Sequence, residues 1–177
     1  MRAAARALSM PQFVRRHDGL YFLKRPIVDT IRAPDKARTA PSFDTQRIGV
    51  ETIQLMRASL EELAELLGAW AHKWMIAALE KRTDTFPDRI SIGRASQSDV
   101  VLKLPFISKL HAHLFVGDDG LVEIVDRSSN GIRLDGEPIG RDQRTPISLG
   151  QTVSFGPLEV ELHDGTSLYH ALREGED

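Results

Sequence analysis

The sequence predicts a mainly β protein built around a β-sandwich, and two observations carry this prediction. Short apolar runs recur between residues 74 and 162, and Gly, Pro, Asp or Asn residues separate them at even spacing. Around residues 110–116 the side chains alternate in character, which is the pattern of a strand with one face in a core. Together these features predict an all-β domain that fills most of the chain after residue 72.

Composition narrows the class of protein. With 177 residues the chain is long enough for one sandwich domain and an appendage. The chain has no Cys, which excludes disulfides, thiolate metal sites and a Cys nucleophile, and favours the cytoplasm as its location. No apolar run has the length of a membrane helix, so no membrane partner is predicted. The Arg- and Ala-rich start lacks the Ser content of a transit peptide and predicts an amphipathic helix.

Charge is distributed unevenly along the chain. Residues 1–40 hold nine basic and three acidic residues, a net charge of +6, although the whole chain carries −2. The remainder is therefore at −8, so an anionic ligand must be attracted by local groups and not by the field of the whole domain. Pro, Asp and apolar residues interrupt the basic segment. We therefore expect a solvated face or a partner for the acidic domain, and no nucleic-acid partner.

The first 48 residues predict a short α/β appendage. Ser9 precedes a Pro and is followed three residues later by Gln12, a capping box that predicts a helix to about His17. Residues 20–23 form a short apolar run typical of a strand, and residues 33–42 are a loop or linker rich in Pro and charge.

A helical segment is expected over residues 49–71. Apolar residues recur there at spacings of three and four, from Ile53 to Trp70, which predicts one apolar helix face. A second capping box, Ser59 with Glu62, instead predicts a single short helix between Ser59 and Gly68. In both cases we expect the apolar face to pack on the sandwich, and docking of a partner is the alternative.

The sandwich domain is expected over residues 72–164. Residues 80–88 predict a polar hairpin or loop. Leu110, Ala112, Leu114 and Val116 are expected to face the core, and His111, His113 and Phe115 to point the other way. A closing helix is expected at residues 167–173, within a C-terminal segment of residues 165–177. The expected strands lie at residues 74–79, 89–93, 100–102, 110–116, 121–125, 132–134, 152–155 and 158–162.

Two loops carry the residues that predict an anion site. In the first, Arg94 follows Gly93, and Ser108 and Lys109 come shortly before the next strand. Arg presents a planar fork of donors that matches a phosphate, and Ser and Lys add further donors to the same oxygens. The second loop is the run from Asp126 to Gly131. In it, Ser129 precedes the turn-forming pair of Asn130 and Gly131.

The ordered set of these residues resembles the forkhead-associated (FHA) family. The resemblance rests on Gly93–Arg94, on Ser108 with His111 three residues later, on Asn130–Gly131, and on the Leu-Gly turn and strand of residues 149–156. It covers residues 73 to about 164. The family usually has a Thr after Asn-Gly where this chain has Ile132, and the stretch from Asp126 to Asn130 is one residue short.

This resemblance implies both a fold and a role. The implied fold is a sandwich of about eleven strands, to which the sequence patterns above add an α/β N-terminal appendage and a C-terminal helix. The implied function is binding of phosphothreonine in an extended peptide, without catalysis or cofactor. Arg94 and Ser108 would contact the phosphate, Asn130 the peptide backbone, and Lys109 and Ser129 would be auxiliary contacts. Gly93, His111 and Gly131 would support the loops.

The sequence thus predicts a reader in Ser/Thr kinase signalling, whose partner is a phosphothreonine-containing protein or the kinase itself. The alternative is a phospho-independent scaffold of the same fold. A hydrolase triad of Ser129, His111 and Asp126 is a third reading, but there is no Gly-x-Ser-x-Gly elbow. His111 and His113 could share a metal, yet the sequence offers no Cys or third His nearby, and no metal site is predicted.

Overall fold

The computed structural model describes residues 1–26 and 73–174. By its internal contacts the chain divides into two compact units, one of residues 1–24 with 75–177 and one of residues 25–74. Every helix and strand described below belongs to the first unit. The helical segment expected at residues 49–71 and the loop expected at 33–42 lie outside the described residues.

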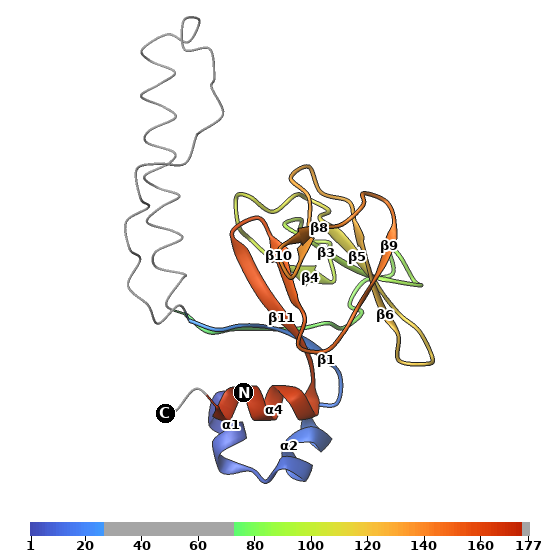
Figure 1. Cartoon of the computed structure of the whole chain (residues 1–177). Helices are drawn as coiled ribbons and strands as arrows, with labels where there is room; N and C mark the ends of the chain where they lie inside the picture. Colours follow the sequence, from blue (N-terminus) through green and yellow to red (C-terminus); the bar gives the residue numbers. More distant parts are fainter. Residues whose placement is uncertain (27–72, 175–177) are drawn as a thin grey trace, which may run out of the picture. The chain divides into compact units, whose positions relative to one another are not determined.

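The described residues form a mainly β fold of two sheets and eleven strands, which confirms the predicted fold class (Figure 1). The six-stranded sheet has the order β2–β1–β11–β10–β7–β8, and the five-stranded sheet has the order β4–β3–β5–β6–β9. The first sheet contains β1 (Leu20–Lys24), β2 (Met75–Ala78), β7 (Arg133–Leu134), β8 (Glu137–Pro138), β10 (Thr152–Phe155) and β11 (Leu158–Asp164). The second contains β3 (Ile90–Gly93), β4 (Val100–Val101), β5 (Ala112–Val116), β6 (Val122–Asp126) and β9 (Arg144–Ile147).

Apolar side chains from both sheets form the core. Ile92, Leu114 and Ile124 of the second sheet are fully buried, as are Phe22 and Phe155 of the first. The Phe22 and Phe155 rings meet edge to face with their centroids 5.7 Å apart. Complete burial of one such side chain stabilises the fold by about 1.5–3 kcal/mol. The core therefore holds rigid the strand ends from which the loops emerge.

Strand β5 departs from the simple alternation expected of it. Ala112 and Leu114 are buried as predicted, but Val116 is 50% exposed, because it lies at the end of the strand beside the Gly117 turn. His111 and His113 were expected on the opposite, outward face, yet both are buried. His113 is covered by the loop before β3, since the Phe86 ring lies 4.7 Å from the His113 ring, centroid to centroid.

Strand β1 also differs from the sequence-based division of the chain. It pairs with β11 on one side and with β2 on the other, so that Phe22 lies opposite both Leu162 and Ala77. Residues 20–24 thus form an inner strand of the six-stranded sheet and are not part of a separate appendage ending at residue 48. The apolar run indicated a strand, but nothing local in it indicated partners so distant in sequence.

Three helices from the two ends of the described chain pack together, α1 (Arg2–Ala7), α2 (Met10–Arg16) and α4 (Gly165–Arg173) (Figure 1). The buried Phe13 ring lies 5.4 Å from the Tyr169 ring. The Gln12 side chain accepts a hydrogen bond of 3.1 Å from Ser9 N, so the predicted start of α2 is confirmed.

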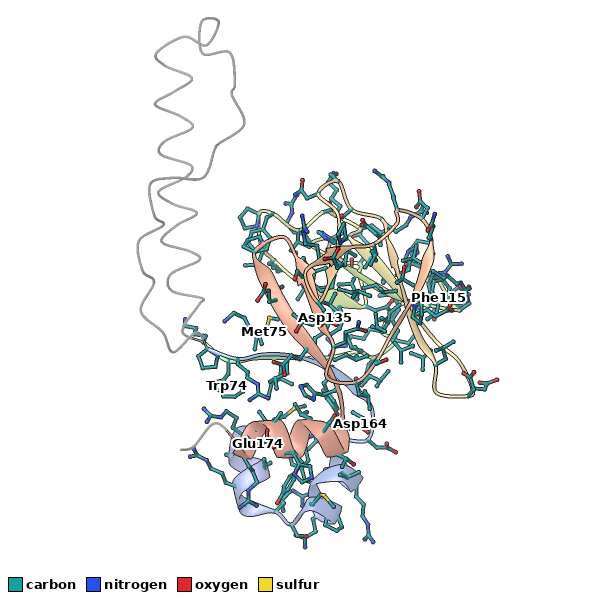
Figure 2. The ribbon with its side chains drawn as sticks, in the orientation of Figure 1. Trp74, Met75, Phe115, Asp135, Asp164 and Glu174 are labelled. Atoms are coloured by element: carbon teal, nitrogen blue, oxygen red, sulfur yellow. The ribbon has the colours of Figure 1, made fainter. Side chains whose placement is uncertain are left out.

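The closing helix is also confirmed, although it begins at Gly165, before the expected Ser167. Asp164 lies where β11 meets α4, and its carboxylate caps the helix by accepting a 2.7 Å hydrogen bond from Ser167 N (Figure 2). A Cβ at residue 165 would overlap the carbonyl oxygen of His17. Only Gly therefore allows α2 to approach the start of α4 this closely.

Candidate functional site

A polar cleft with a volume of about 470 Å³ opens between the loops that the sequence singled out. The loop after β3, the loop before β5 and the loop after β6 all contribute to its lining. The five residues expected to contact a ligand are all among its lining residues: Arg94, Ser108, Lys109, Ser129 and Asn130. Arg127, Pro105, Phe106, Ile107 and Leu110 complete the lining.

Gly93 sets the distance between the first two loops. A Cβ at this position would overlap the backbone carbonyl of Lys109. With no side chain there, Arg94 N donates to Ser108 O at 2.9 Å and Ala95 N donates to Lys109 O at 3.1 Å. Close backbone approach is a standard use of Gly, and here it brings Arg94 beside Ser108 and Lys109.

The Arg94 side chain is held at one end and free at the other. Its Nε donates to Ile107 O at 3.1 Å, which orients the guanidinium plane. Within the described residues its two terminal nitrogens make no hydrogen bond, and the same holds for the Lys109 ammonium. The guanidinium of Arg94 is therefore oriented by the protein, while its two terminal nitrogens keep free hydrogen-bond donors that could make a bidentate contact to an anion.

Ser108 joins the two sides of the cleft. Its Oγ accepts a 3.2 Å hydrogen bond from Ser129 N, which directs the hydroxyl hydrogen away from that loop. The hydroxyl can therefore donate to a ligand while remaining fixed by its neighbour. Asn130 Nδ2 makes only a long 3.4 Å contact with Phe106 O, so its amide is available to a ligand backbone.

The second loop is shaped by side chains that bond their own backbone. Ser128 N donates to Asp126 Oδ1 at 2.8 Å, and Gly131 N donates to Ser128 Oγ, also at 2.8 Å. Gly131 has a φ of +85°, a left-handed conformation that a side chain would disfavour. Ser128 is buried by this arrangement, whereas Ser129 and Asn130 stay exposed at the cleft.

His111 lies behind the loops and not in the cleft. It is fully buried, its Nδ1 accepts a 3.0 Å hydrogen bond from Ser108 N, and its ring packs edge to face on Phe155 at 5.3 Å. Its backbone carbonyl accepts from Arg127 N at 2.9 Å, so one residue fixes both loops. Burial lowers the pKa of His111 against an opposing effect of Asp126, which favours the neutral ring with its proton on Nε2.

The two alternative chemistries considered from the sequence are a hydrolase triad and a metal site. Among residues 1–26 and 73–174, no hydrogen bond joins His111 to the Ser129 hydroxyl or to Asp126. In the same part of the chain there is no group of three His, Cys, Asp or Glu side chains that could hold a metal ion. No described helix is long and apolar enough to span a membrane.

The cleft also contains residues that sequence reasoning missed. Arg127 adds a third cation to Arg94 and Lys109, and no acidic residue lines the cleft. Its position beside the Asn-Gly loop and its charge were the only signals in the sequence. Phe106 and Leu110 form a partly buried apolar side, which no polar motif marks.

Comparison with models of known protein families gives a match within this part of the chain. Residues 90–156, from β3 through β10 and including most of the cleft, match the family model of the FHA domain, which confirms the resemblance seen in the sequence. No curated protein matches the chain.

Among solved structures the chain is similar to several FHA proteins. The N-terminal FHA domain of S. cerevisiae Rad53p, solved with a phosphothreonine peptide, is 22% identical over 52% of this chain and 78% of that one, with a TM-score of 0.42. The FHA domain of Chlamydia trachomatis CT664 is 28% identical over 51% and 85%, with a TM-score of 0.43. Mycobacterium tuberculosis EmbR, solved with a low-affinity phosphopeptide, is 16% identical over 66% and 32%, with a TM-score of 0.42.

Proposed function

We propose that the cleft binds phosphothreonine in an extended peptide, and that the protein is a non-catalytic reader in Ser/Thr kinase signalling. One observation carries the proposal. The free donors of Arg94, Ser108 and Lys109 converge on one cleft that contains no acidic residue of the protein. A phosphothreonine offers the complementary group, with a charge of about −1.5 to −2 and three acceptor oxygens.

The residue roles follow from what each side chain has left to offer. The terminal nitrogens of Arg94 and the Ser108 hydroxyl contact the phosphate, and Lys109 adds charge beside them. Asn130 binds the peptide backbone, and Ser129 is an auxiliary contact on the facing loop. Gly93, His111 and Gly131 position these groups without touching the ligand.

Attraction to this site is local. The chain outside residues 1–40 carries a net charge of −8, so the protein as a whole does not steer an anion to the cleft. The match of residues 90–156 to the FHA family supports the same ligand class. The partner we propose is a phosphothreonine-containing protein or a Ser/Thr kinase in the cytoplasm.

The proposal also covers the organisation of the chain. The module of residues 72–164 would be the binding unit, with strand β1 completing its sheet and residues 165–177 closing it through α4. Apart from β1, residues 1–48 would be an accessory segment.

Calorimetric titration of a phosphothreonine peptide library and its dephosphorylated copy, at fixed salt, tests this function. We expect only the phosphorylated peptides to bind. Arg94→Gln should reduce their affinity by about 2–5 kcal/mol, because it removes a charged donor pair from a bound phosphate.

Arg133→Gln is the matched control, since Arg133 also carries an exposed positive charge but binds Gly136 O away from the cleft lining. Its affinity should stay close to that of the unmodified chain. Equal binding of phosphorylated and dephosphorylated peptides would favour the phospho-independent scaffold. Unchanged affinity in a folded Arg94→Gln protein would refute the phosphate site.

A further inference from the structure

The second loop of the cleft contains a pair of residues that can react with each other. Asn130 is the only Asn in the chain, and Gly131 follows it directly. When Gly follows Asn, the backbone nitrogen of the Gly can reach the amide carbon of the Asn side chain, because no Cβ obstructs the approach. Asn130 is exposed at the cleft, so water can reach its side chain. The pair is thus open to deamidation, in which the side-chain amide is lost as ammonia.

The reaction needs no reagent other than water. Gly131 N gives up its hydrogen to the solvent and attacks Asn130 Cγ, and the new N–C bond closes a five-membered succinimide ring. The Cγ–Nδ2 bond breaks, and this nitrogen takes up a proton and leaves as ammonia. Water then adds to one of the two ring carbonyls and opens the ring, which leaves either Asp or isoaspartate at residue 130. Overall one water is consumed and one ammonia is released, and nothing is oxidised or reduced.

Ser128 restrains the first step of this reaction. Gly131 N donates to Ser128 Oγ at 2.8 Å, and Ser128 is buried. A hydrogen bond made by the neutral N–H disfavours the loss of its proton. Ser128 N itself donates to Asp126 Oδ1 at 2.8 Å, which holds the accepting residue in place. The nucleophile of the reaction is therefore occupied as long as this loop keeps its shape.

The side chain that Gly131 N would attack is not held in the same way. Within the described residues, the Asn130 amide makes only the long contact of 3.4 Å with Phe106 O, which is too weak to fix its position. The side chain can therefore rotate toward Gly131 whenever Gly131 N leaves Ser128. The rate of the reaction then depends mainly on how often this one hydrogen bond opens.

The product changes the charge of the cleft. No acidic residue is among the lining residues, which include Arg94, Lys109 and Arg127. Deamidation replaces a neutral amide, which donates and accepts hydrogen bonds, with a carboxylate, which only accepts. A carboxylate beside a bound phosphate is a pair of like charges, and such pairs are strongly unfavourable in an interface. The modified cleft is therefore a poor site for a phosphate.

We infer that Asn130 is a site of spontaneous deamidation, that Ser128 slows the reaction, and that the acidic product prevents phosphopeptide binding. The reaction at Asn130 is independent of any ligand, whereas its effect on binding rests on the proposed function. Each molecule thus loses its binding site with age, and the Ser128 hydroxyl sets the rate of that loss.

Peptide mapping by mass spectrometry, after incubation at mildly alkaline pH, tests the reaction. The samples are the unmodified full chain, its Ser128→Ala and Ser129→Ala variants, and a free peptide with the sequence of residues 126–133. We expect Ser128→Ala to convert about twofold to tenfold faster than the unmodified chain, which is the factor that one hydrogen bond supplies. Ser129→Ala is the matched control and should convert like the unmodified chain, because Gly131 N donates to Ser128 and not to Ser129. The free peptide should convert fastest.

Two results would overturn this part of the inference. If the unmodified chain converts as fast as the free peptide, Ser128 does not restrain the reaction, and this comparison needs no substitution. If a Ser128→Ala protein that is folded by circular dichroism stays unconverted while the free peptide converts completely, Asn130 is not a deamidation site.

Calorimetry of the full chain with a phosphothreonine peptide tests the effect on binding. Asn130→Asp reproduces one of the two products, and Asn130→Ala removes the amide without adding a charge. We expect Asn130→Asp to bind about tenfold more weakly than Asn130→Ala, or weaker still, because only Asp places a charge beside the phosphate. Equal affinities would overturn the effect assigned to the carboxylate. Failure of the unmodified chain to bind any phosphopeptide would instead refute the proposed function, and the mass-spectrometric result on Asn130 would stand.

Discussion

Two groups of hydrogen-bond donors lie at opposite ends of strand β3, and one of them surrounds a carboxylate of the protein itself. Near the start of the strand, Asp99 is completely buried and accepts hydrogen bonds from five donors. They are Lys81 Nζ at 2.9 and 3.0 Å, the backbone N–H groups of Arg82 at 2.8 Å and Thr83 at 2.7 Å, and Ser91 through its N–H at 2.8 Å and hydroxyl at 2.7 Å. We call this set the Asp99 cage.

The cleft after the end of β3 presents similar donors without a carboxylate among them. Arg94 and Lys109 have free terminal nitrogens within the described chain, and Ser108 has a free hydroxyl hydrogen. The Asp99 cage joins the loop of residues 80–88 to β3 and so completes the fold. Under the proposed function, the anion of the cleft would come from a ligand. The comparison indicates that the same donor chemistry can serve stability in one place and, as proposed, binding in the other.

The pKa of Asp99 reflects the completeness of its cage. Burial alone would raise this pKa, because a charged carboxylate loses its hydration. The hydrogen bonds from Ser91 and Arg82 and the contact with Lys81 more than offset this effect. They hold the pKa of Asp99 far below its ordinary range. The carboxylate is therefore charged at any ordinary pH.

The largest effect is expected on stability, when the carboxylate at the centre of the Asp99 cage is removed. Asp99→Ala leaves Lys81 and several buried N–H groups without their acceptor, and should lower the free energy of unfolding by about 3–5 kcal/mol. Urea denaturation followed by circular dichroism measures this. Asp88→Ala is the control, because within the described residues Asp88 makes an exposed ion pair with Arg89, and its loss should change stability little. Equal losses in the two variants would remove the distinction between a structural and a surface carboxylate.

Substitutions of His111 and Ser108 should have different effects, the first mainly on stability and the second mainly on phosphopeptide binding. His111→Ala leaves Ser108 N unsatisfied behind the loops and should cost about 1–3 kcal/mol of stability. Ser108→Ala removes an accessible hydroxyl, so phosphopeptide affinity should fall while the melting temperature changes little. Both quantities are to be measured for both variants. A His111→Ala protein with unchanged stability and no binding would make His111 a ligand contact.

Acid should weaken the Asp99 cage only at a pH well below the one at which phosphopeptide binding weakens. Because the folded pKa of Asp99 lies below that of the unfolded chain, the unfolded state binds a proton first as the pH falls. The stability from this group is full above about pH 4 and declines below it, by at most about 1.4 kcal/mol per pH unit. Urea denaturation between pH 5 and about 2.5 should therefore show a steeper decline in the unmodified chain than in Asp99→Asn. Parallel declines in the two proteins would contradict the cage as described.

The smallest expected effect is the pH dependence of binding. Phosphopeptide affinity should weaken several-fold as the pH falls through about 6, because the phosphate loses its second charge there. The contribution of His111 should be small, since burial lowers the pKa of its ring from the ordinary value. Calorimetry at pH 7.5 and about 5.5 measures the change, and a peptide with Glu in place of phosphothreonine should bind weakly at both. A Glu peptide that matches the phosphopeptide would indicate a general acidic groove.

Sequence reasoning was strongest where a local pattern determines local structure. Short apolar runs predicted most strands, and the loop motifs predicted that Arg94, Ser108 and Asn130 line one cleft. It failed where partners are distant. The run at residues 20–23 indicated a strand but could not indicate that β11 and β2 flank it.

Other elements had too weak a signal. Strand β9 has one buried residue, Ile147, and β8 has none, so neither shows an apolar pattern. The Asp99 cage was missed because the sequence alone does not show whether an Asp in a loop is buried or exposed. Arg127 was missed because no local pattern in the sequence shows that it is one of the residues lining the cleft.

Amide chemical-shift mapping with a phosphothreonine peptide tests the central claim most directly, because it locates the ligand without mutating the site. We expect the largest shifts at the amides of Arg94, Ser108 and Ser129, and almost none at those of Arg82 and Thr83 in the Asp99 cage. The dephosphorylated peptide should leave all five in place. Large shifts confined to other parts of the chain, or identical shifts from both peptides, would contradict a phosphate site in this cleft.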